Sequence, residues 1–326
     1  DNTYKSWGYD YFFSSQYFKE GKGYNVGYGL KDKIFMQDSA QYIEQLPQPF
    51  YAKLITVTNH YPYLLDKKNQ SIAKTDTGDD TVDGYVQTAR YLDQALGEFM
   101  TWLQKTGLDK NSMLVLYGDH YGISGNHKKA VAKLLGKDKF TDFDNAQFQR
   151  VPFMVHMPGL KGGVNHTYGG EIDVLPTLLN LLGVKNNDTI QFGSDLLAAN
   201  RNQTVAYRNG DFVTPEYTKV GSTYYDTKTG KALTNLTSAQ KRKVLAISEH
   251  VTKELSLSDK VITGDLLRFY TPSGFEDPDK SQISYKVTDA KAKLKADNKK
   301  SKTSVIQKNG GKSTMNLYQT DAPELK

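Results

Sequence analysis

The sequence predicts an α/β fold, with a mostly parallel sheet flanked by helices and a small C-terminal antiparallel α+β subdomain. Over residues 34–182, short apolar runs suited to buried strands alternate with amphipathic helical segments, an order typical of parallel α/β sheets. After about residue 204 the pattern changes to short strands of alternating polarity joined by Asn-Gly and Thr-Gly turns, which is typical of an antiparallel meander. We therefore divide the chain into a first domain (1–203), a small subdomain (204–270) and a tail (271–326).

Within the first domain the helices follow from three- and four-residue apolar spacing, and the strands follow from short runs of β-branched and aliphatic residues. Pro47 and Gly107 supply the stop signals for the first two helices. The expected elements are a helix at 34–46, a strand at 50–57, a helix at 79–105, strands at 113–117 and 151–157, and a helix at 172–182.

The small subdomain and the tail differ in charge. The expected subdomain elements are strands at 204–207, 211–213, 216–220 and 223–226 and a helix at 238–255. Residues 281–326 hold ten Lys against four Asp or Glu, which accounts for the whole net charge of +6. Such a segment is expected to be a solvated, poorly ordered arm, or to lie against an anionic membrane or wall polymer. Nucleic-acid binding is not favoured, because only Tyr285 and Tyr318 interleave with the lysines.

Composition excludes several classes of protein. No run of 18 apolar residues occurs, so the sequence predicts no membrane-spanning helix. The absence of Cys excludes disulfides, thiolate nucleophiles and thiolate zinc sites. The first residues do not resemble a signal peptide and lack an initiating Met, so we expect a processed or excised segment.

The segment of most chemical interest follows the predicted strand at 113–117. Asp119 and His120 come directly after this strand, where ligands sit in open α/β sheets. An adjacent carboxylate and imidazole can ligate one metal ion if other strands supply further ligands, and these donors suit Mn²⁺ or Mg²⁺. The alternative is an Asp that caps the next helix beside an ordinary surface His. The flanking Gly118 and Gly122 favour the metal site, because glycine lets the backbone turn sharply near an ion.

Four more polar residues are expected near the same edge of the sheet. His60, after Asn59 at a strand end, suits a donor to an anionic oxygen or a general acid or base, or else is a histidine satisfied by a carbonyl. Ser124 can reach a phosphate oxygen or cap the next helix, and the two roles can coexist. His127 and Asn59 are expected to support the ligands from outside. For His127 the alternatives are a ligand of a second metal ion and a plain surface position.

Five motifs in a fixed order give the sequence a family resemblance. They are Tyr-Lys-Ser-Trp-Gly-Tyr-Asp (4–10), Thr-Asn-His-Tyr-Pro-Tyr (58–63), Tyr-Leu-Asp-Gln-Ala-Leu-Gly (91–97), Gly-Asp-His-Tyr-Gly-Ile-Ser (118–124) and Tyr-Gly-Gly-Glu-Ile-Asp-Val-Leu-Pro-Thr-Leu-Leu (168–179). Together they resemble the extracellular catalytic domain of lipoteichoic acid synthases, which are phosphoglycerol transferases of Gram-positive bacteria in the alkaline phosphatase and sulfatase superfamily. The resemblance runs from residue 1 to about residue 270 and implies a partial sulfatase-like catalytic domain at 1–203.

The resemblance also implies a chemistry and a set of partners. Asp119 and His120 match ligands of the family's single Mn²⁺ or Mg²⁺ ion, His60 matches the histidine that contacts the phosphoglycerol group, and Ser124 matches a serine beside it. The family moves glycerol phosphate from phosphatidylglycerol, through a threonine-linked intermediate, to glycolipid-anchored polyglycerol phosphate. The implied partners are these lipids at a membrane surface, and no nucleic acid. The implied location is the extracellular face of the cell membrane, with an extracellular domain that can be released.

Other site residues of the family have no match here. Its Glu ligand and nucleophilic Thr lie upstream of the motif at 4–10, so we expect this chain to be the C-terminal part of the enzyme domain and inactive by itself. Two other functions stay open. One is a phosphodiesterase or phosphatase of the same fold, which differs only in its acceptor. The other is a non-catalytic module that binds an anionic wall polymer.

Overall fold

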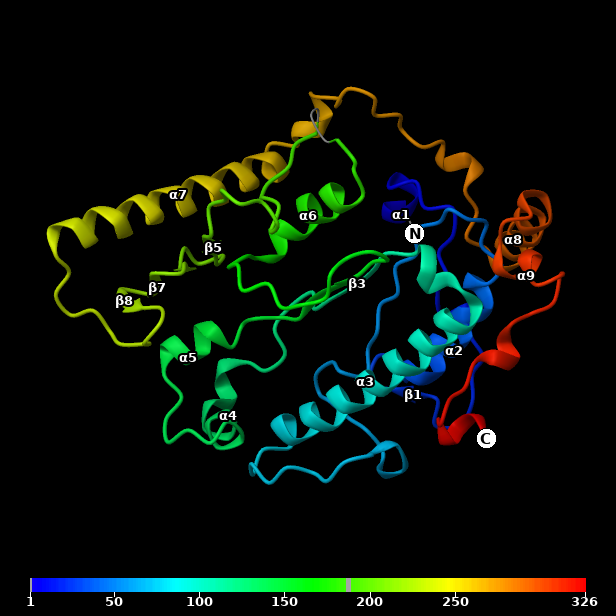
Figure 1. Ribbon diagram of the computed structural model, residues 1–326, viewed down its shortest axis with the longest axis horizontal. Coiled ribbons are helices and arrows are strands. Elements are labelled where there is room, and N and C mark those ends of the chain that lie inside the picture. Colours follow the sequence, from blue (N-terminus) through cyan, green and yellow to red (C-terminus); the bar gives the residue numbers. More distant parts are fainter. Residues whose placement is uncertain (1, 186–188) are drawn as a thin grey trace. The chain divides into compact units, whose positions relative to one another are not determined.

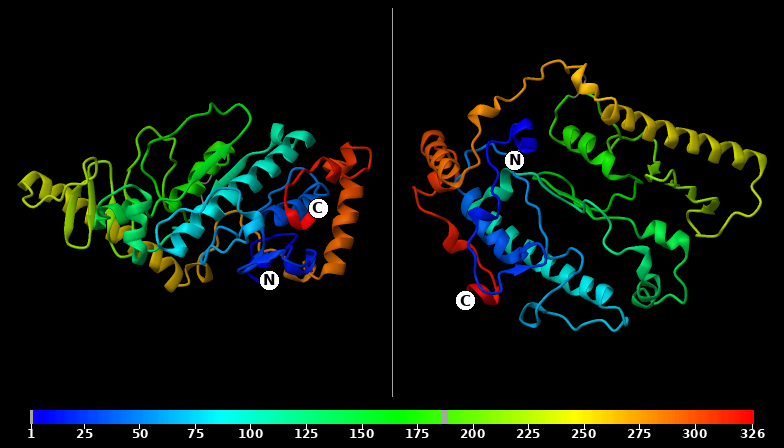
Figure 2. Two further views of the ribbon diagram at one scale, coloured as in Figure 1. Left: turned by 90° about the horizontal axis from the view of Figure 1, so that it is seen from below. Right: turned by 180° about the vertical axis from the view of Figure 1, so that it is seen from behind.

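The computed structural model describes residues 2–185 and 189–326. Its chain divides into two compact units, and each is described by itself (Figures 1 and 2). The first unit comprises residues 1–139, 151–160 and 277–326, and the second comprises 140–150 and 161–276. The expected boundaries at 203 and 270 are therefore not those of the structure, because the chain leaves the first unit and returns to it.

Two helices form the centre of the first unit. Helix α2 (Asp32–Ile43) packs beside α3 (Asp80–Thr106), as Figure 1 shows. The Asp79 side chain accepts hydrogen bonds from two backbone N–H groups of the first turn of α3, and Gly107 ends this helix with φ of +74°. Both predicted helices are confirmed.

Smaller elements complete the two units. The first unit also holds α1 (Asn2–Ser6), β1 (Asn25–Val26), β2 (Gly29–Leu30), β3 (Leu114–Tyr117), α4 (Lys128–Leu134), β4 (Phe153–His156), α8 (Val287–Ser301) and α9 (Val305–Lys308). The second holds α5 (Asp142–Gln147), α6 (Val174–Leu181), β5 (Val205–Ala206), β6 (Phe212–Val213), β7 (Tyr217–Val220), β8 (Thr223–Asp226) and α7 (Ser238–Thr263).

Strands β3 and β4 form an antiparallel pair in which Tyr117 lies opposite Phe153. Both strands were predicted from the sequence, but the expectation that neighbouring strands are parallel is wrong for this pair. Apolar composition marks a buried strand without encoding its direction, which depends on the path of the connection.

The strand expected at 50–57 does not belong to any sheet among the described residues. Tyr51 and Ile55 in this segment are exposed, at 74% and 53%. A strand is defined by its ladder partner as much as by its own residues, and the described chain offers this segment none.

The Lys-rich tail is packed, which corrects the expectation of a poorly ordered arm. From residue 277 onward it belongs to the first unit, and α8 and α9 lie near α2 in both views (Figures 1 and 2). Ala290 and Leu294 of α8 are buried in one core cluster, and Val305 and Tyr318 are buried in another. These few apolar residues are spaced among many lysines, so net charge alone concealed them.

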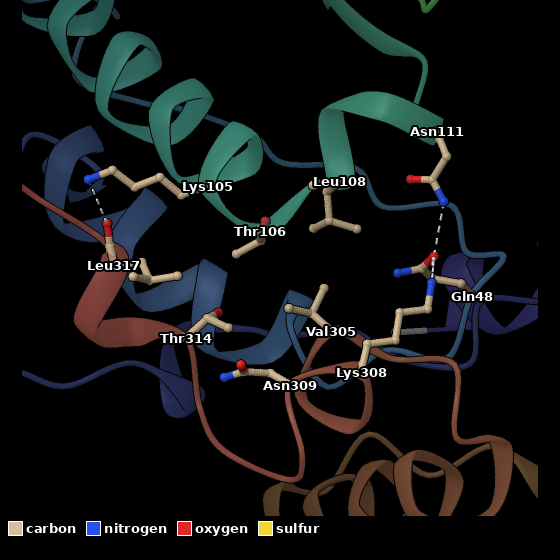
Figure 3. Close-up of a pocket in the computed structure, with 11 residues that line it drawn as sticks. Gln48, Lys105, Thr106, Leu108, Asn111, Val305, Lys308, Asn309, Thr314 and Leu317 are labelled. Carbon is tan, nitrogen blue, oxygen red and sulfur yellow. Dashed lines mark hydrogen bonds between the residues drawn. The ribbon is translucent and has the colours of Figure 1, made fainter.

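A hollow of about 240 Å³ marks where the C-terminal segment meets the end of α3 (Figure 3). Leu108 and Leu317 contribute apolar lining. Lys105 donates to the carbonyl of Leu317 at 3.4 Å, and Lys308 donates to Gln48 Oε1 at 2.9 Å. The two lysines therefore help to fasten the C-terminal segment to the rest of the first unit.

A buried ion pair anchors the last residues of the chain. The fully buried side chain of Glu324 accepts hydrogen bonds from Lys31 at 2.6 Å and from Asn69 at 2.8 Å. Lys31 also pairs with Asp66. Burial acts to raise the pKa of Glu324, but the hydrogen bonds from Lys31, Asn69 and Lys68 outweigh it and lower this pKa to about 2.

The second unit contains the predicted meander. Strands β5 to β8 form one four-stranded antiparallel sheet in sequence order. Helix α7 covers it, with Val244 and Val251 buried against Phe212 and Tyr217. The helix runs beyond its predicted end at residue 255.

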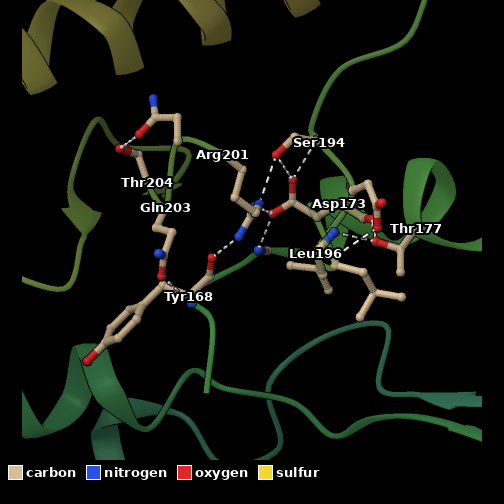
Figure 4. Close-up of polar contacts among 12 residues, drawn as sticks. Tyr168, Asp173, Thr177, Ser194, Leu196, Arg201, Gln203 and Thr204 are labelled. Atoms are coloured by element: carbon tan, nitrogen blue, oxygen red, sulfur yellow. Dashed lines mark hydrogen bonds and ion pairs between the residues drawn. The ribbon is translucent and has the colours of Figure 1, made fainter. Parts of the chain in front are cut away.

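The segment around α6 is held by a buried ion pair (Figure 4). Arg201 Nη2 lies 2.8 Å from Asp173 Oδ2, and both side chains are almost fully buried. The same carboxylate accepts hydrogen bonds from the backbone N–H groups of Gly170 at 2.9 Å and Ser194 at 2.7 Å. A single carboxylate thus joins three separate stretches of this unit, which explains why an Asp inside the motif at 168–179 is structural.

No helix in the described part of the chain combines the length and the apolar character needed to cross a membrane.

Replacing Glu324 with Gln should lower the free energy of unfolding by about 2 kcal/mol near neutral pH, as for hydrogen bonds between charged groups. Because the pKa of Glu324 in the folded protein lies below its ordinary value of 4.5, the contribution is complete above pH 4.5 and is lost as the pH falls toward 2. Urea unfolding of both proteins at pH 7 and pH 3 measures this. The difference should shrink at pH 3, and an equal difference at both pH values would contradict the assignment. Glu276→Gln, at an exposed carboxylate, is the control.

Candidate active site

The loop after β3 carries Asp119 and His120, as predicted. The N–H of Gly118 donates to the carbonyl of Pro152 at 3.1 Å, which extends the β3–β4 pairing by one residue and fixes where the loop leaves the strands. A Cβ added to Gly118 would lie only 2.9 Å from the side chain of Val151. This glycine is therefore needed because the neighbouring strand comes so close.

Gly122 has a similar role at the other end of the motif. A Cβ there would lie 2.6 Å from the ring of Tyr85 on α3. Neither Gly118 nor Gly122 has the positive φ that would favour glycine for its conformation alone. The sequence prediction that these glycines matter is sound, but close packing is the reason for both.

Asp119 and His120 can reach one ion. His120 Nδ1 lies 2.7 Å from the carbonyl oxygen of Tyr121, and a carbonyl only accepts, so Nδ1 carries the proton. The lone pair of the neutral ring is then on Nε2, which lies 3.8 Å from Asp119 Oδ1. Two ligands each about 2.1 Å from one cation can be up to about 4.2 Å apart. A histidine that donates its other ring N–H to a carbonyl is the usual arrangement for a metal ligand.

The two candidate ligands are exposed, at 79% for the Asp119 side chain and 51% for that of His120. No group of three or more His, Asp, Glu or Cys suited to a metal occurs in the part of the chain that the structure describes. The donor types fit Mn²⁺ or Mg²⁺, but two exposed ligands supply only part of a coordination shell. We therefore expect weak metal binding by this chain alone.

His60 lies beside His120, as the sequence predicted from two separate strand ends. The two imidazole rings meet edge to face with centroids 5.4 Å apart. His60 Nδ1 lies 2.8 Å from the carbonyl of Tyr61, so its Nε2 is also left for a ligand. Tyr28, in the turn between β1 and β2, packs edge to face on His60 at 5.2 Å.

The loop that holds His60 is fixed from α2 and α3. Asp32 at the start of α2 accepts hydrogen bonds from the N–H groups of Val57 at 3.0 Å and Thr58 at 3.1 Å. Burial raises the pKa of Asp32 from its ordinary value. Asn59 Oδ1 accepts a hydrogen bond from Thr88 Oγ1 of α3 at 2.8 Å. Asn59 therefore positions the loop rather than a ligand.

One hydroxyl joins the loop that carries His60 to the loop that carries His120; these are called the two histidine loops below. The Tyr63 hydroxyl donates to the carbonyl of Gly122, and its ring packs edge to face on Tyr85 at 5.2 Å. Tyr63 has a φ of +59°, a conformation that non-glycine residues rarely adopt. Burial raises its pKa to about 12, so it remains a hydrogen-bond donor at any physiological pH.

These loops enclose a hollow of about 620 Å³ beside His120. Its lining residues are Tyr61, Thr81, His120, Tyr121, Gly122, Ser124, Asn126 and His127. Ser124 precedes the short 3₁₀ turn at Gly125–His127, and its side chain makes no capping hydrogen bond there. The capping role considered for Ser124 is not seen, and its hydroxyl is left for a ligand in the hollow.

His127 enters the hollow from the far end of the same loop. Its Nδ1 lies 2.7 Å from Asp79 Oδ2, at the start of α3. His127 is thus not a plain surface residue. It joins the loop to α3.

Three residues at the site were not predicted from the sequence, namely Tyr28, Tyr63 and Asp79. Tyr63 belongs to the motif at 58–63, but no pattern in one sequence shows that its hydroxyl reaches Gly122. Asp79 was recognised only as the start of a helix. An Asp that caps a helix through one carboxylate oxygen has a second oxygen free for another partner. This is the one signal that could have suggested a further contact for Asp79.

The fold agrees with the family comparisons. A sequence model of the sulfatase family matches residues 1–184, so the chain belongs to the sulfatase family. A protein in the alkaline phosphatase superfamily from Vibrio parahaemolyticus has a similar structure, with a TM-score of 0.54 and 15% identity over 75% of this chain and 59% of that one. This likeness, which concerns the fold alone, and the sulfatase match confirm the predicted α/β fold class.

More specific relatives are lipoteichoic acid synthases. The chain is 51% identical over 285 residues to lipoteichoic acid synthase 1 and 48% identical to lipoteichoic acid synthase 2, both of Bacillus subtilis. It is 44% identical over 285 residues to lipoteichoic acid synthase of Staphylococcus aureus. Each match covers 87% of this chain but only 43% or 44% of the relative. The chain therefore spans less than half the length of these relatives.

Replacing Tyr63 with Phe should weaken the link between the two histidine loops without disturbing the helices. The ring stays against Tyr85, but the hydrogen bond to Gly122 is lost, at a cost of about 1 kcal/mol. Backbone amide exchange should quicken in residues 118–124 and remain unchanged in α2 and α3. Tyr61→Phe, at an exposed tyrosine, is the matched control. If amide exchange at residues 118–124 is unchanged in Tyr63→Phe, the hydroxyl does not hold that loop.

Proposed function

We propose that this chain forms part of a metal-dependent phosphoglycerol transferase that builds polyglycerol phosphate from phosphatidylglycerol. The observation that supports it best is the grouping of Asp119, His120 and Ser124 in one loop, with His60 against it, in a chain 44–51% identical to lipoteichoic acid synthases. His120 and Ser124 line the hollow, and Asp119 and His60 lie beside His120. Carboxylate, imidazole and hydroxyl groups so close together suit a phosphoryl group and a cation.

Asp119 and His120 would hold Mn²⁺ or Mg²⁺ through Oδ1 and Nε2. Bound there, the cation would polarise the phosphoryl oxygen and lower the pKa of the attacking hydroxyl. Ser124 would donate its hydroxyl to a phosphate oxygen, and His60, when protonated at Nε2, would donate to another. Tyr28 would keep the His60 ring in place. Together these groups orient the phosphoryl group for attack.

The nucleophile in this proposal is a threonine outside this chain. It attacks phosphatidylglycerol, diacylglycerol leaves, and glycerol phosphate stays bound to the threonine until the end of a glycolipid-anchored polyglycerol phosphate accepts it. Because the donor is a lipid, the proposed location of the reaction is the extracellular face of the cell membrane. Use of water as the acceptor would make the protein a phosphodiesterase instead.

The test compares two proteins. One is this chain alone. The other, called the extended chain below, carries at its amino end the part of Bacillus subtilis lipoteichoic acid synthase 1 that precedes the matched region. With fluorescent phosphatidylglycerol and Mn²⁺, only the extended chain should release diacylglycerol and form polyglycerol phosphate. Release of free glycerol phosphate without polymer would favour the phosphodiesterase, and polymer binding without turnover would favour the binding module.

His60→Ala in the extended chain should reduce turnover about 100-fold or more without unfolding it, because a donor to the phosphoryl group is lost. His250→Ala, at an exposed histidine of α7, should keep full turnover. Full activity of this chain alone would place the nucleophile within these residues, and full activity of His60→Ala would reject the substrate contact.

A further inference from the structure

The proposed function leaves His127 and Asp79 without a part in the chemistry, although their geometry is that of an acid–base pair. His127 Nδ1 lies 2.7 Å from Asp79 Oδ2. The hydrogen bond from His127 lowers the pKa of Asp79, and bonds from backbone N–H groups of α3 act in the same direction. The carboxylate is therefore ionised and only accepts, which places a proton on His127 Nδ1.

The carboxylate is held rigidly. Asp79 Oδ1 accepts hydrogen bonds from the backbone N–H groups of Thr81 at 3.0 Å and Val82 at 3.3 Å, while Oδ2 serves His127. The start of a 27-residue helix also places positive charge beside it. A carboxylate that is fixed on one side and bonded to an imidazole on the other orients that ring, as in other acid–base pairs of enzymes.

His127 lines the 620 Å³ hollow together with His120 and Ser124. Its side chain is 23% exposed, so water and small hydroxyl groups can reach it. The loop that carries it begins at the candidate metal ligands and leads into α4, and the His127 side chain reaches Asp79 at the start of α3. A group bound through its phosphate near Ser124 would therefore have its ester oxygen or an incoming hydroxyl in the same hollow as His127.

We propose that His127, oriented by Asp79, is the general acid and base for the two alcohols that exchange on phosphorus. This inference rests on the proposed function and adds a catalytic residue to it. It assigns His127 to the alcohol groups and leaves the phosphate oxygens to Ser124 and His60.

Protons balance over the two halves of the reaction. In the first, the threonine oxygen bonds to phosphorus, its proton passes to water, and the bond from phosphorus to the diacylglycerol oxygen breaks as protonated His127 gives that oxygen its Nε2 proton. In the second, the hydroxyl of the polymer end bonds to phosphorus and gives its proton to Nε2. The threonine–phosphorus bond breaks, and the threonine oxygen regains a proton from water. Water and His127 each end as they began.

The experiment uses two donors in the extended chain. Phosphatidylglycerol leaves an alcohol, whose oxygen needs a proton, whereas a 4-nitrophenyl ester of glycerol phosphate leaves a stable phenolate that needs none. His127→Gln should slow diacylglycerol release about 100-fold or more and nitrophenolate release by only a few-fold. His250→Gln, the same change at an exposed histidine, should affect neither donor.

Asp79→Asn is the second variant, because the single amide oxygen of Asn can still cap the first turn of α3 in place of Oδ1, whereas its NH₂ group then faces His127 Nδ1 and cannot accept from it. It should slow only the phosphatidylglycerol reaction, by about 10-fold. Equal slowing of both donors in either variant would show that the pair merely shapes the loop, and no slowing in His127→Gln would also overturn the inference. If the unmodified extended chain turns over neither donor, the proposed function itself fails, which is a different result.

Discussion

Helix α3 is the constraint on which the site depends. Its 27 residues span about 40 Å, and its start and first three turns contact the loop that carries His60 and the loop that carries His120. Asp79 bonds to His127, Tyr85 packs against Gly122 and Tyr63, and Thr88 bonds to Asn59. The far end of the helix packs on the C-terminal segment. The histidine loops are therefore positioned by a rigid helix rather than by strand ends alone.

Polar groups at the site divide into those that hold the backbone and those left free for a ligand. The loop backbone is held by hydrogen bonds of Asp32, Asn59 and Tyr63. His60 and His120 each use Nδ1 on a neighbouring carbonyl and keep Nε2. This division fixes the orientation of the reactive atoms before any substrate arrives, which is what an active site requires. The Asp119 side chain is 79% exposed, which leaves space beside it for further groups.

The sequence was sufficient for the elements with strong local signals. The amphipathic period and caps of α3, the turns of the β5–β8 sheet and the strand before Gly118 were all readable. Other features could not be predicted, because they depend on partners distant in sequence. These are the direction of the strands, the lack of a partner for the segment at 50–57, and the packing of α8 and α9. Among site residues, His60 and His120 were correctly expected to meet, since both follow apolar strand-like runs. The bond from Tyr63 to Gly122 and the pair of Asp79 and His127 join residues with no shared motif.

The account rests most heavily on a shared cation at Asp119 and His120. Anomalous scattering from crystals of the extended chain soaked in Mn²⁺ measures it directly. We expect one manganese peak within coordination distance of Asp119 Oδ1 and His120 Nε2, and its loss in His120→Ala. Manganese bound elsewhere, for example between Asp79 and His127, with no peak at Asp119 in crystals whose solvent reaches that loop, would contradict the account.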